Sequence, residues 1–234
     1  MAAGLDGATC PLGVCDGSGF VVDEDSRVAV PCACRPQQVE RRRARSLSAV
    51  IPRKYRSVSF DQPPVTEIAE PVVRAVRRYV GDIDARLDDG DGLWLEGDVG
   101  TGKTTLAMLV SRAALDAGRS VAIYSVPRLL AAIRSTFDAD SEGSYVDFVD
   151  RLTRVDLLHL DDLGAERSNS WVLEQLYAIV NARYEDERSI LITTNLPLDE
   201  LGEQITPRTV SRLKEMCDVL PLYGADARAR LRSV

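Results

Sequence analysis

The feature that most constrains this chain is a glycine-rich octapeptide that follows a short apolar segment. Residues 97–104 read Gly-Asp-Val-Gly-Thr-Gly-Lys-Thr. Glycines at these positions let successive backbone N–H groups face one anion, and the start of the next helix adds partial positive charge. Lys103 can reach the β- and γ-phosphates of a nucleotide, and the Thr104 hydroxyl can bind Mg²⁺. The segment therefore predicts a phosphate-binding loop between a strand at 93–95 and a helix at 103–117.

We expect the bound nucleotide to be ATP and its contacts to come from the loop and the first helical turn. The contacting residues are predicted to be Gly97, Asp98, Val99, Gly100, Thr101, Gly102, Lys103, Thr104 and Thr105.

Length and charge exclude several classes of protein. A chain of 234 residues can hold one α/β domain and a small appendage. It has no apolar run of membrane-spanning length, and its N-terminus lacks the layout of a signal peptide. We therefore expect a cytoplasmic protein with no membrane partner. The net charge of −7 argues against uniform nucleic-acid binding, although residues 35–56 are locally rich in arginine.

Four of the five cysteines lie in two close pairs near the N-terminus: Cys10, Cys15, Cys32 and Cys34. Two such pairs of thiolates suit tetrahedral Zn²⁺. A segment with so few large apolar residues also has little else to stabilise a fold. The alternative is four reduced thiols in an unstructured leader. Cys217 lies far away and is expected to be a small buried residue.

Apolar strands and amphipathic helices alternate after residue 90, which predicts a parallel sheet flanked by helices on both faces. The expected strands are 93–95, 121–126, 155–160, 190–193 and 219–222. The expected helices are 103–117, 128–137, 145–153, 171–186, 198–204 and 210–215. A further amphipathic helix develops from Pro63, with Ile68, Val72, Val76, Tyr79, Val80 and Ile83 at helical spacing.

Polar residues at the ends of two expected strands complete the nucleotide site. Asp161 and Asp162 end an apolar strand, and strand ends of a parallel sheet converge on its ligand. Asp161 is predicted to hold Mg²⁺ opposite Thr104, and Asp162 to polarise the attacking water. Asn195 follows the next strand and is expected to contact the γ-phosphate or orient that water. His159, the only histidine, is expected to be a packed core residue.

These patterns divide the chain into three parts. Residues 1–36 form a predicted zinc-binding module, residues 37–62 a basic linker, and residues 63–234 an ATPase domain. The linker is either a solvated connector or an arm that contacts the phosphates of single-stranded DNA.

From residue 50 to 230 the chain resembles the AAA+ ATPases of the DnaC/DnaI-like helicase-loader family of bacteria and phages, with IstB-like transposition helpers as close relatives. The resemblance depends on the phosphate-binding loop and on five further segments: Leu160–Glu166, Trp171–Tyr184, Thr193–Leu196, Ser211–Leu213 and Gly224–Arg228.

The resemblance assigns three further roles. It implies that Asn195 is the sensor-1 residue, that Arg212 is an arginine finger offered to the adjacent protomer, and that Arg228 is a sensor-2 residue that contacts the nucleotide. It also implies that the paired helices at 128–153 line a DNA-binding groove. The chain stops soon after Arg228, so no full lid domain is expected.

The resemblance further implies an ATPase that loads the hexameric replicative helicase onto single-stranded DNA during replication initiation. It would use ATP, Mg²⁺ and Zn²⁺, self-associate through its ATP sites, and be stimulated by DNA or its partner. Two alternatives stay open: an IstB-like ATPase that activates a transposase on target DNA, and a nucleotide-binding adaptor without hydrolysis.

Overall fold

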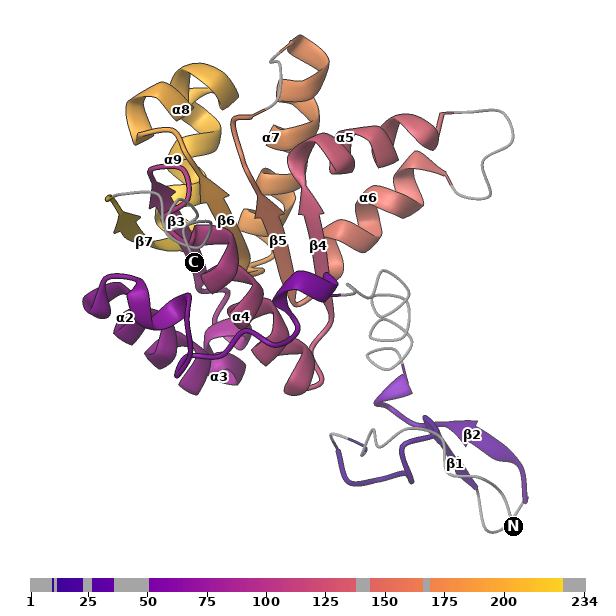
Figure 1. The fold of residues 1–234 in the computed structure, drawn as a ribbon. Helices are drawn as coiled ribbons and strands as arrows, with labels where there is room; N and C mark the ends of the chain where they lie inside the picture. The colour runs from indigo at the N-terminus through magenta and orange to yellow at the C-terminus, as the bar shows by residue number, and fades with distance from the viewer. Residues whose placement is uncertain are drawn as a thin grey trace. The chain divides into compact units, whose positions relative to one another are not determined.

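The structure is a computed structural model that describes residues 10, 12–22, 27–35, 51–137, 144–165 and 169–224. Two compact units make up the chain, residues 1–46 and residues 47–234. Figure 1 draws both units. The first contains the four N-terminal cysteines, and the second contains the phosphate-binding loop.

The second unit is built on a five-stranded parallel sheet. Its strands are β3 (Gly92–Gly97), β4 (Val121–Ser125), β5 (Leu157–Asp161), β6 (Ile190–Thr194) and β7 (Cys217–Leu222). Their order is β4-β5-β6-β3-β7, and all neighbours are parallel. β6 is buried along its whole length, as expected for a strand covered on both faces. The predicted parallel α/β sheet is confirmed.

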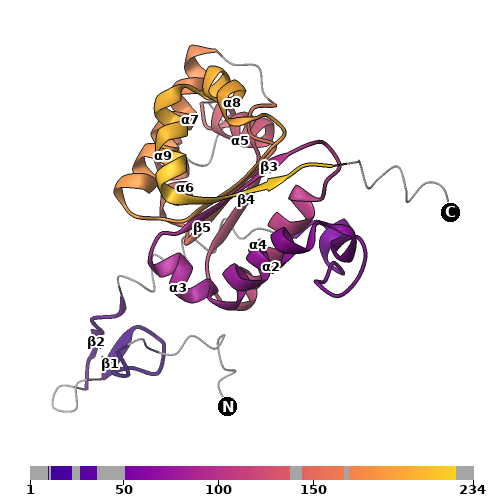
Figure 2. The ribbon, with the colours of Figure 1, turned by 90° about the vertical axis from the view of Figure 1, so that its left-hand side faces the viewer.

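Helices cover both faces of this sheet. They are α2 (Glu70–Gly81), α3 (Ile83–Asp88), α4 (Lys103–Asp116), α5 (Val126–Ser135), α6 (Tyr145–Arg154), α7 (Ser170–Glu185), α8 (Leu198–Ile205) and α9 (Pro207–Met216). Figure 2 shows α2, α3 and α4 on one face and α7, α8 and α9 on the other. Within the described residues, none of the helices combines the length and apolar character needed to cross a membrane.

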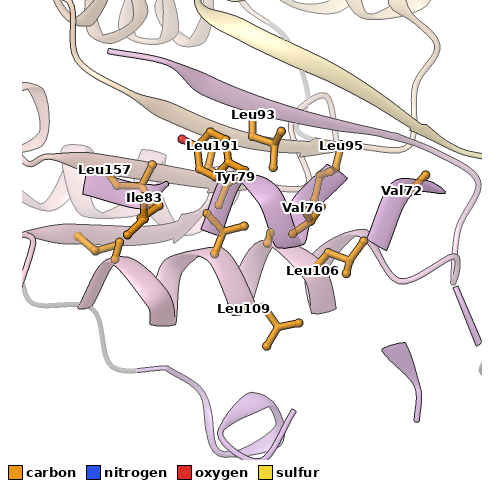
Figure 3. Close-up of a cluster of buried hydrophobic side chains, with 14 of the residues drawn as sticks. Val72, Val76, Tyr79, Ile83, Leu93, Leu95, Leu106, Leu109, Leu157 and Leu191 are labelled. Carbon is orange, nitrogen blue, oxygen red and sulfur yellow. The ribbon is translucent and has the colours of Figure 1, made fainter. Parts of the chain in front are cut away.

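One hydrophobic core lies between the sheet and the layer of α2, α3 and α4 (Figure 3). Val76, Leu95, Leu106 and Leu157 are fully buried there. Burial of each such side chain stabilises the fold by about 1.5–3 kcal/mol. This layer fixes α4, the helix that follows the phosphate-binding loop, against the sheet.

Two predicted elements differ from the structure. The continuous helix expected from Pro63 to Ile83 is instead a 3₁₀ turn, η2 (Val65–Glu67), followed by α2 and α3, which are separated at Asp82. Gly81 lowers helical stability at that break. α9 begins at Pro207, three residues before the predicted start, because proline is favoured in the first turn and Thr206 caps the Thr209 N–H.

The C-terminal part of the predicted basic linker belongs to the second unit. Residues 51–62 include a 3₁₀ turn, η1 (Arg53–Tyr55), and Val58 is buried in the core beneath α2, α3 and α4. Residues 51–62 are therefore described with the second unit. Residues 37–50 of that linker lie outside the described residues.

The first unit contains a two-stranded antiparallel hairpin. β1 (Phe20–Val22) pairs with β2 (Ala29–Pro31), with Val21 opposite Val30. This hairpin was not among the predicted strands, because its three-residue strands are too short to show a clear alternation.

Candidate nucleotide-binding site and cysteine cluster

Strand order brings the predicted site residues to one edge of the sheet. β3 lies beside β6, and β6 lies beside β5. The phosphate-binding loop follows β3, Asp161 ends β5, and Asn195 follows β6. Because all three strands run in the same direction, their carboxyl ends meet at one place.

Two glycines of the loop have no substitute. Gly97 has φ +138°, and a Cβ there would collide with the Leu222 carbonyl oxygen. Gly102 has φ +100° and precedes the first residue of α4; a Cβ there would collide with the Ile68 side chain. The loop thus depends on backbone conformations and space that only glycine offers.

Lys103 is folded into its own loop. Its ammonium group donates hydrogen bonds to the carbonyl oxygens of Gly97 at 2.7 Å and Asp98 at 2.5 Å. The side chain is 5% exposed. These bonds hold a buried cation at the loop, where phosphate oxygens would compete for it.

Asp161 is joined to the loop by a hydroxyl. The Thr104 hydroxyl donates to Asp161 Oδ1 at 2.9 Å, and the Thr193 hydroxyl donates to the same oxygen at 2.8 Å. Thr193 also accepts a hydrogen bond from the Asp162 N–H at 2.9 Å. The predicted Mg²⁺ ligands, Thr104 and Asp161, are thus in direct contact. Thr193 was missed, because threonine in an apolar strand is typical of ordinary sheet packing.

A pocket of about 250 Å³ adjoins the loop. Asp162 and Asn195 line it together with the loop residues Val99–Thr105. Asp162 has a left-handed backbone, φ +57°, a conformation that aspartate tolerates better than most residues. The structure therefore brings both residues to the same cavity as Lys103.

Four further residues line the pocket: Lys54, Tyr55, Pro64 and Ile68. Lys54 and Tyr55 come from the predicted linker, and Pro64 and Ile68 come from the start of the predicted ATPase domain. The sequence signal was weak, since Ile51-Pro52-Arg53-Lys54-Tyr55 shows no periodicity. A tyrosine ring and an isoleucine side chain give this part of the pocket an apolar surface suited to a planar base.

His159 is fully buried in β5, as predicted. Its Nδ1 lies 2.9 Å from the Ser111 hydroxyl of α4, and its Nε2 lies 3.9 Å from Asp161 Oδ1. Burial lowers the pKa of His159 to about 3, because removal from water disfavours the charged imidazole. The ring is therefore neutral at physiological pH.

Arg212 lies on α9 and is absent from the lining of the nucleotide pocket. Its guanidinium is stacked over the rings of Tyr177, at 5.1 Å, and Tyr184, at 5.3 Å, both from α7. Arg208 also covers the Tyr177 ring, at 4.8 Å. Two arginines and two tyrosines thus form one cation–π cluster between α7 and α9.

Arg228 lies outside the described residues. Tyr223 and Gly224, the last described residues, lie near the phosphate-binding loop, because the Gly224 N–H donates to Asp98 Oδ2 at 3.1 Å and the Tyr223 hydroxyl donates to Glu96 Oε1 at 3.2 Å.

The four N-terminal cysteines form a cluster in the first unit. The sulfur atoms of Cys10, Cys15, Cys32 and Cys34 all lie within 4.8 Å of one another, and those of Cys15 and Cys34 are 3.6 Å apart. Tetrahedral Zn²⁺ with bonds of about 2.3 Å needs sulfur pairs separated by about 3.8 Å. The Cys15 N–H, directed at the Cys10 thiol, lowers the pKa of Cys10 to about 6. The cluster can therefore hold a zinc ion.

Comparisons with known proteins agree with this geometry. Residues 83–234 match the profile of the IstB-like ATP binding protein family. Over 138 residues the chain is 28% identical to the replicative helicase loader DnaC of Escherichia coli strain K12, a match that covers 59% of this chain and 55% of the relative. Over 116 residues it is 33% identical to the uncharacterized protein YdaV of the same strain, covering 48% and 46%. The chain spans about half the length of these curated relatives.

Solved structures show the same fold. The crystal structure of the DnaC helicase loader matches with a TM-score of 0.64 and 25% identity, covering 73% of this chain and 99% of that one. The crystal structure of DnaI matches with a TM-score of 0.57 and 22% identity, covering 75% and 96%. The second unit therefore has an AAA+ fold. Since the family profile spans well over half of the sequence and includes the phosphate-binding loop, Asp161, Asp162 and Asn195, the chain belongs to the IstB-like ATP binding protein family.

Proposed function

We propose that this chain is an ATP-dependent loader that places a hexameric replicative helicase on single-stranded DNA during replication initiation. Similarity to DnaC in sequence and fold supports helicase loading. The observation on which the ATP dependence rests is the hydrogen bond between Thr104 of the loop and Asp161 of β5. This hydrogen bond joins the phosphate-binding loop to the carboxylate at the end of β5.

ATP binding would begin with an exchange of partners at Lys103. The ammonium group leaves the carbonyl oxygens of Gly97 and Asp98 and turns to the β- and γ-phosphates. Charge-assisted bonds to phosphate are stronger than bonds to neutral carbonyls. The N-terminus of α4 supplies further N–H donors. Tyr55 and Ile68 would contact the base.

Thr104 and Asp161 would hold Mg²⁺. The Thr104 oxygen has a lone pair for the cation, and turning toward the cation would weaken the hydrogen bond that it now donates to Asp161 Oδ1. Asp161 Oδ1 already accepts two hydroxyl donors, so Oδ2 is the oxygen directed to the cation or its waters. A hydroxyl and a carboxylate are donors that Mg²⁺ prefers.

Hydrolysis would use residues that surround the γ-phosphate. Asp162 accepts a proton from the attacking water, and Asn195 orients it. Arg212 would act on the nucleotide of an adjacent protomer, which agrees with its absence from its own pocket. Arg228 would reach the nucleotide from the anchored C-terminal segment. Loss of the γ-phosphate then weakens contacts between protomers and releases the loader.

The N-terminal part would bind the helicase. We propose a zinc-binding module at residues 1–36, held by Cys10, Cys15, Cys32 and Cys34, a basic linker after it, and the ATPase domain to residue 234. The paired helices α5 and α6 and the basic linker would contact single-stranded DNA.

The test is co-purification followed by a loading assay. The full chain should retain a hexameric replicative helicase from the same genome and deposit it on a single-stranded DNA circle in the presence of ATP. Asp162→Asn should still form the complex but release the helicase slowly. A chain that binds no helicase under conditions where it binds ATP would contradict the loader proposal.

The family match supports a second candidate function, in which the chain activates a transposase on target DNA. Recovery of a transposase and no helicase in the same co-purification would favour it.

A further inference from the structure

We propose that His159 is a positioning residue for the cation site, and that its Nε2–H donates a hydrogen bond to Asp161 when Mg²⁺–nucleotide is bound. The proposal rests on the proposed function of the pocket. His159 is 0% exposed and stands two residues before Asp161 in β5. Among the described residues, no hydrogen-bond partner lies within reach of its Nε2.

Electrostatics assigns the proton to Nε2. The Ser111 hydroxyl lies 2.9 Å from Nδ1, so one of the two groups donates to the other. If Nδ1 carried the proton, the Nε2 lone pair would face the Asp161 carboxylate at 3.9 Å, which is repulsive. With Ser111 as donor, the Nε2–H faces that carboxylate instead. This tautomer places a neutral donor toward the acidic residue of the site.

This donor has no hydrogen-bond partner among the described residues. A separation of 3.9 Å is too long for a hydrogen bond, and a shift of about 1 Å would form one. A buried N–H without a partner is unfavourable. Any state in which the Asp161 carboxylate moves onto Nε2 removes that penalty. The structure thus contains a donor that is satisfied only if Asp161 changes position.

Cation binding is the event expected to move Asp161. In the structure Oδ1 accepts hydrogen bonds from Thr104 and Thr193. When the Thr104 oxygen is drawn to the cation, its bond to Oδ1 weakens and Oδ1 gains room for a further donor. His159 then supports the carboxylate from the core side while Oδ2 faces the cation. Because the bond forms only in the loaded state, it adds to cation affinity rather than to stability alone.

Three variants and one control separate this role from simple core packing. His159→Leu keeps most of the volume and removes both nitrogens. His159→Gln retains an amide donor. Ser111→Ala removes the group that selects the tautomer. Ser120→Ala is the control, since the Ser120 hydroxyl bonds Asp156 at 2.6 Å, at the far end of β5 from Asp161. It loses a buried hydrogen bond without touching the cation site.

The measurement is cation affinity with nucleotide present. Mn²⁺ binding to the full chain with ATP is followed by electron paramagnetic resonance, and Mg²⁺ is titrated against a fluorescent ATP analogue. His159→Leu should weaken cation binding about tenfold, with nucleotide affinity in EDTA unchanged. His159→Gln should recover most of the loss, Ser111→Ala should weaken binding less than His159→Leu, and Ser120→Ala should bind like the native chain.

Native-like cation affinity in His159→Leu would overturn the inference, as would equal losses in His159→Leu and Ser120→Ala. If His159→Leu does not fold, native-like affinity in Ser111→Ala overturns it instead. Failure of the native chain to bind any cation–nucleotide complex would overturn the proposed function as well, so the two failures are distinguishable.

Discussion

The two units of this chain are stabilised by different means. In the second unit, residues such as Val76, Leu95 and Leu106 are fully buried between helices and sheet. Among the described residues of the first unit, the buried side chains are those of Cys10, Cys32 and Cys34, with Val21 partly buried against them, while the other large apolar side chains are exposed: Leu12, Val14, Phe20, Val22, Val28 and Val30. The apolar core is enough to explain the stability of the second unit. The stability of the first unit needs a group that joins the sulfur atoms.

Zinc removal is the sharpest way to separate the two units. We expect a chelator, or Cys32→Ser, to unfold the first unit, because structural zinc contributes about 10–16 kcal/mol to such small folds. The second unit should keep its fold and its ATP affinity. Elemental analysis of untreated protein should show about one zinc per chain. Its absence, with the cysteine unit still folded, would contradict this account.

A substitution of Arg183 tests the stability of the second unit alone. Its fully buried guanidinium donates to the carbonyl oxygens of Leu152, Thr153, Val155, Asp156 and Ser189. Arg183→Leu leaves these acceptors without their donor, so the free energy of unfolding should fall by about 3 kcal/mol or more. Denaturant unfolding measures this, with Arg188→Leu as a control because Arg188 is half-buried and its ion pair spans 3.6 Å. Zinc content should not change. Equal effects of the two substitutions would contradict the role given to Arg183.

The substitution Lys103→Ala tests nucleotide binding rather than the stability of the fold. We expect ATP affinity to fall at least about a hundredfold, since the buried cation that would meet the phosphates is removed. Titration calorimetry measures the loss, and Lys214→Ala, an exposed lysine on α9, should bind ATP normally. Retained affinity in Lys103→Ala would place the nucleotide elsewhere.

Acid should weaken the second unit through its only histidine. His159 has a pKa of about 3 when folded and about 6.5 when unfolded, so the unfolded state binds more protons between these values. Stability is therefore full above pH 6.5 and falls below it by at most about 1.4 kcal/mol per pH unit. Trp94 and Trp171, the two tryptophans, both lie in the second unit, so their fluorescence follows its unfolding alone. His159→Gln should reduce the slope between pH 6.5 and 5.5, and an unchanged slope would contradict this assignment.

The sequence predicted most of the second unit because its signals are local. Glycines fix the loop at Gly97 and Gly102, and an apolar strand ending in two acids identifies Asp161. The strand order was not predictable, since it depends on which faces pack together. For the same reason the roles of three residues were not predicted. Tyr55 comes from a segment without periodicity, Ile68 was expected only to face the core, and the role of Thr193 depends on its register beside Asp161.

The most direct test of the central claim is Mg²⁺-dependent ATP hydrolysis by the full chain and by Asp161→Asn, with single-stranded DNA and helicase present. We expect phosphate release by the native chain and almost none by the variant, although both keep the same fold by circular dichroism. Equal phosphate release by the two proteins would show that Asp161 and the phosphate-binding loop do not form one site.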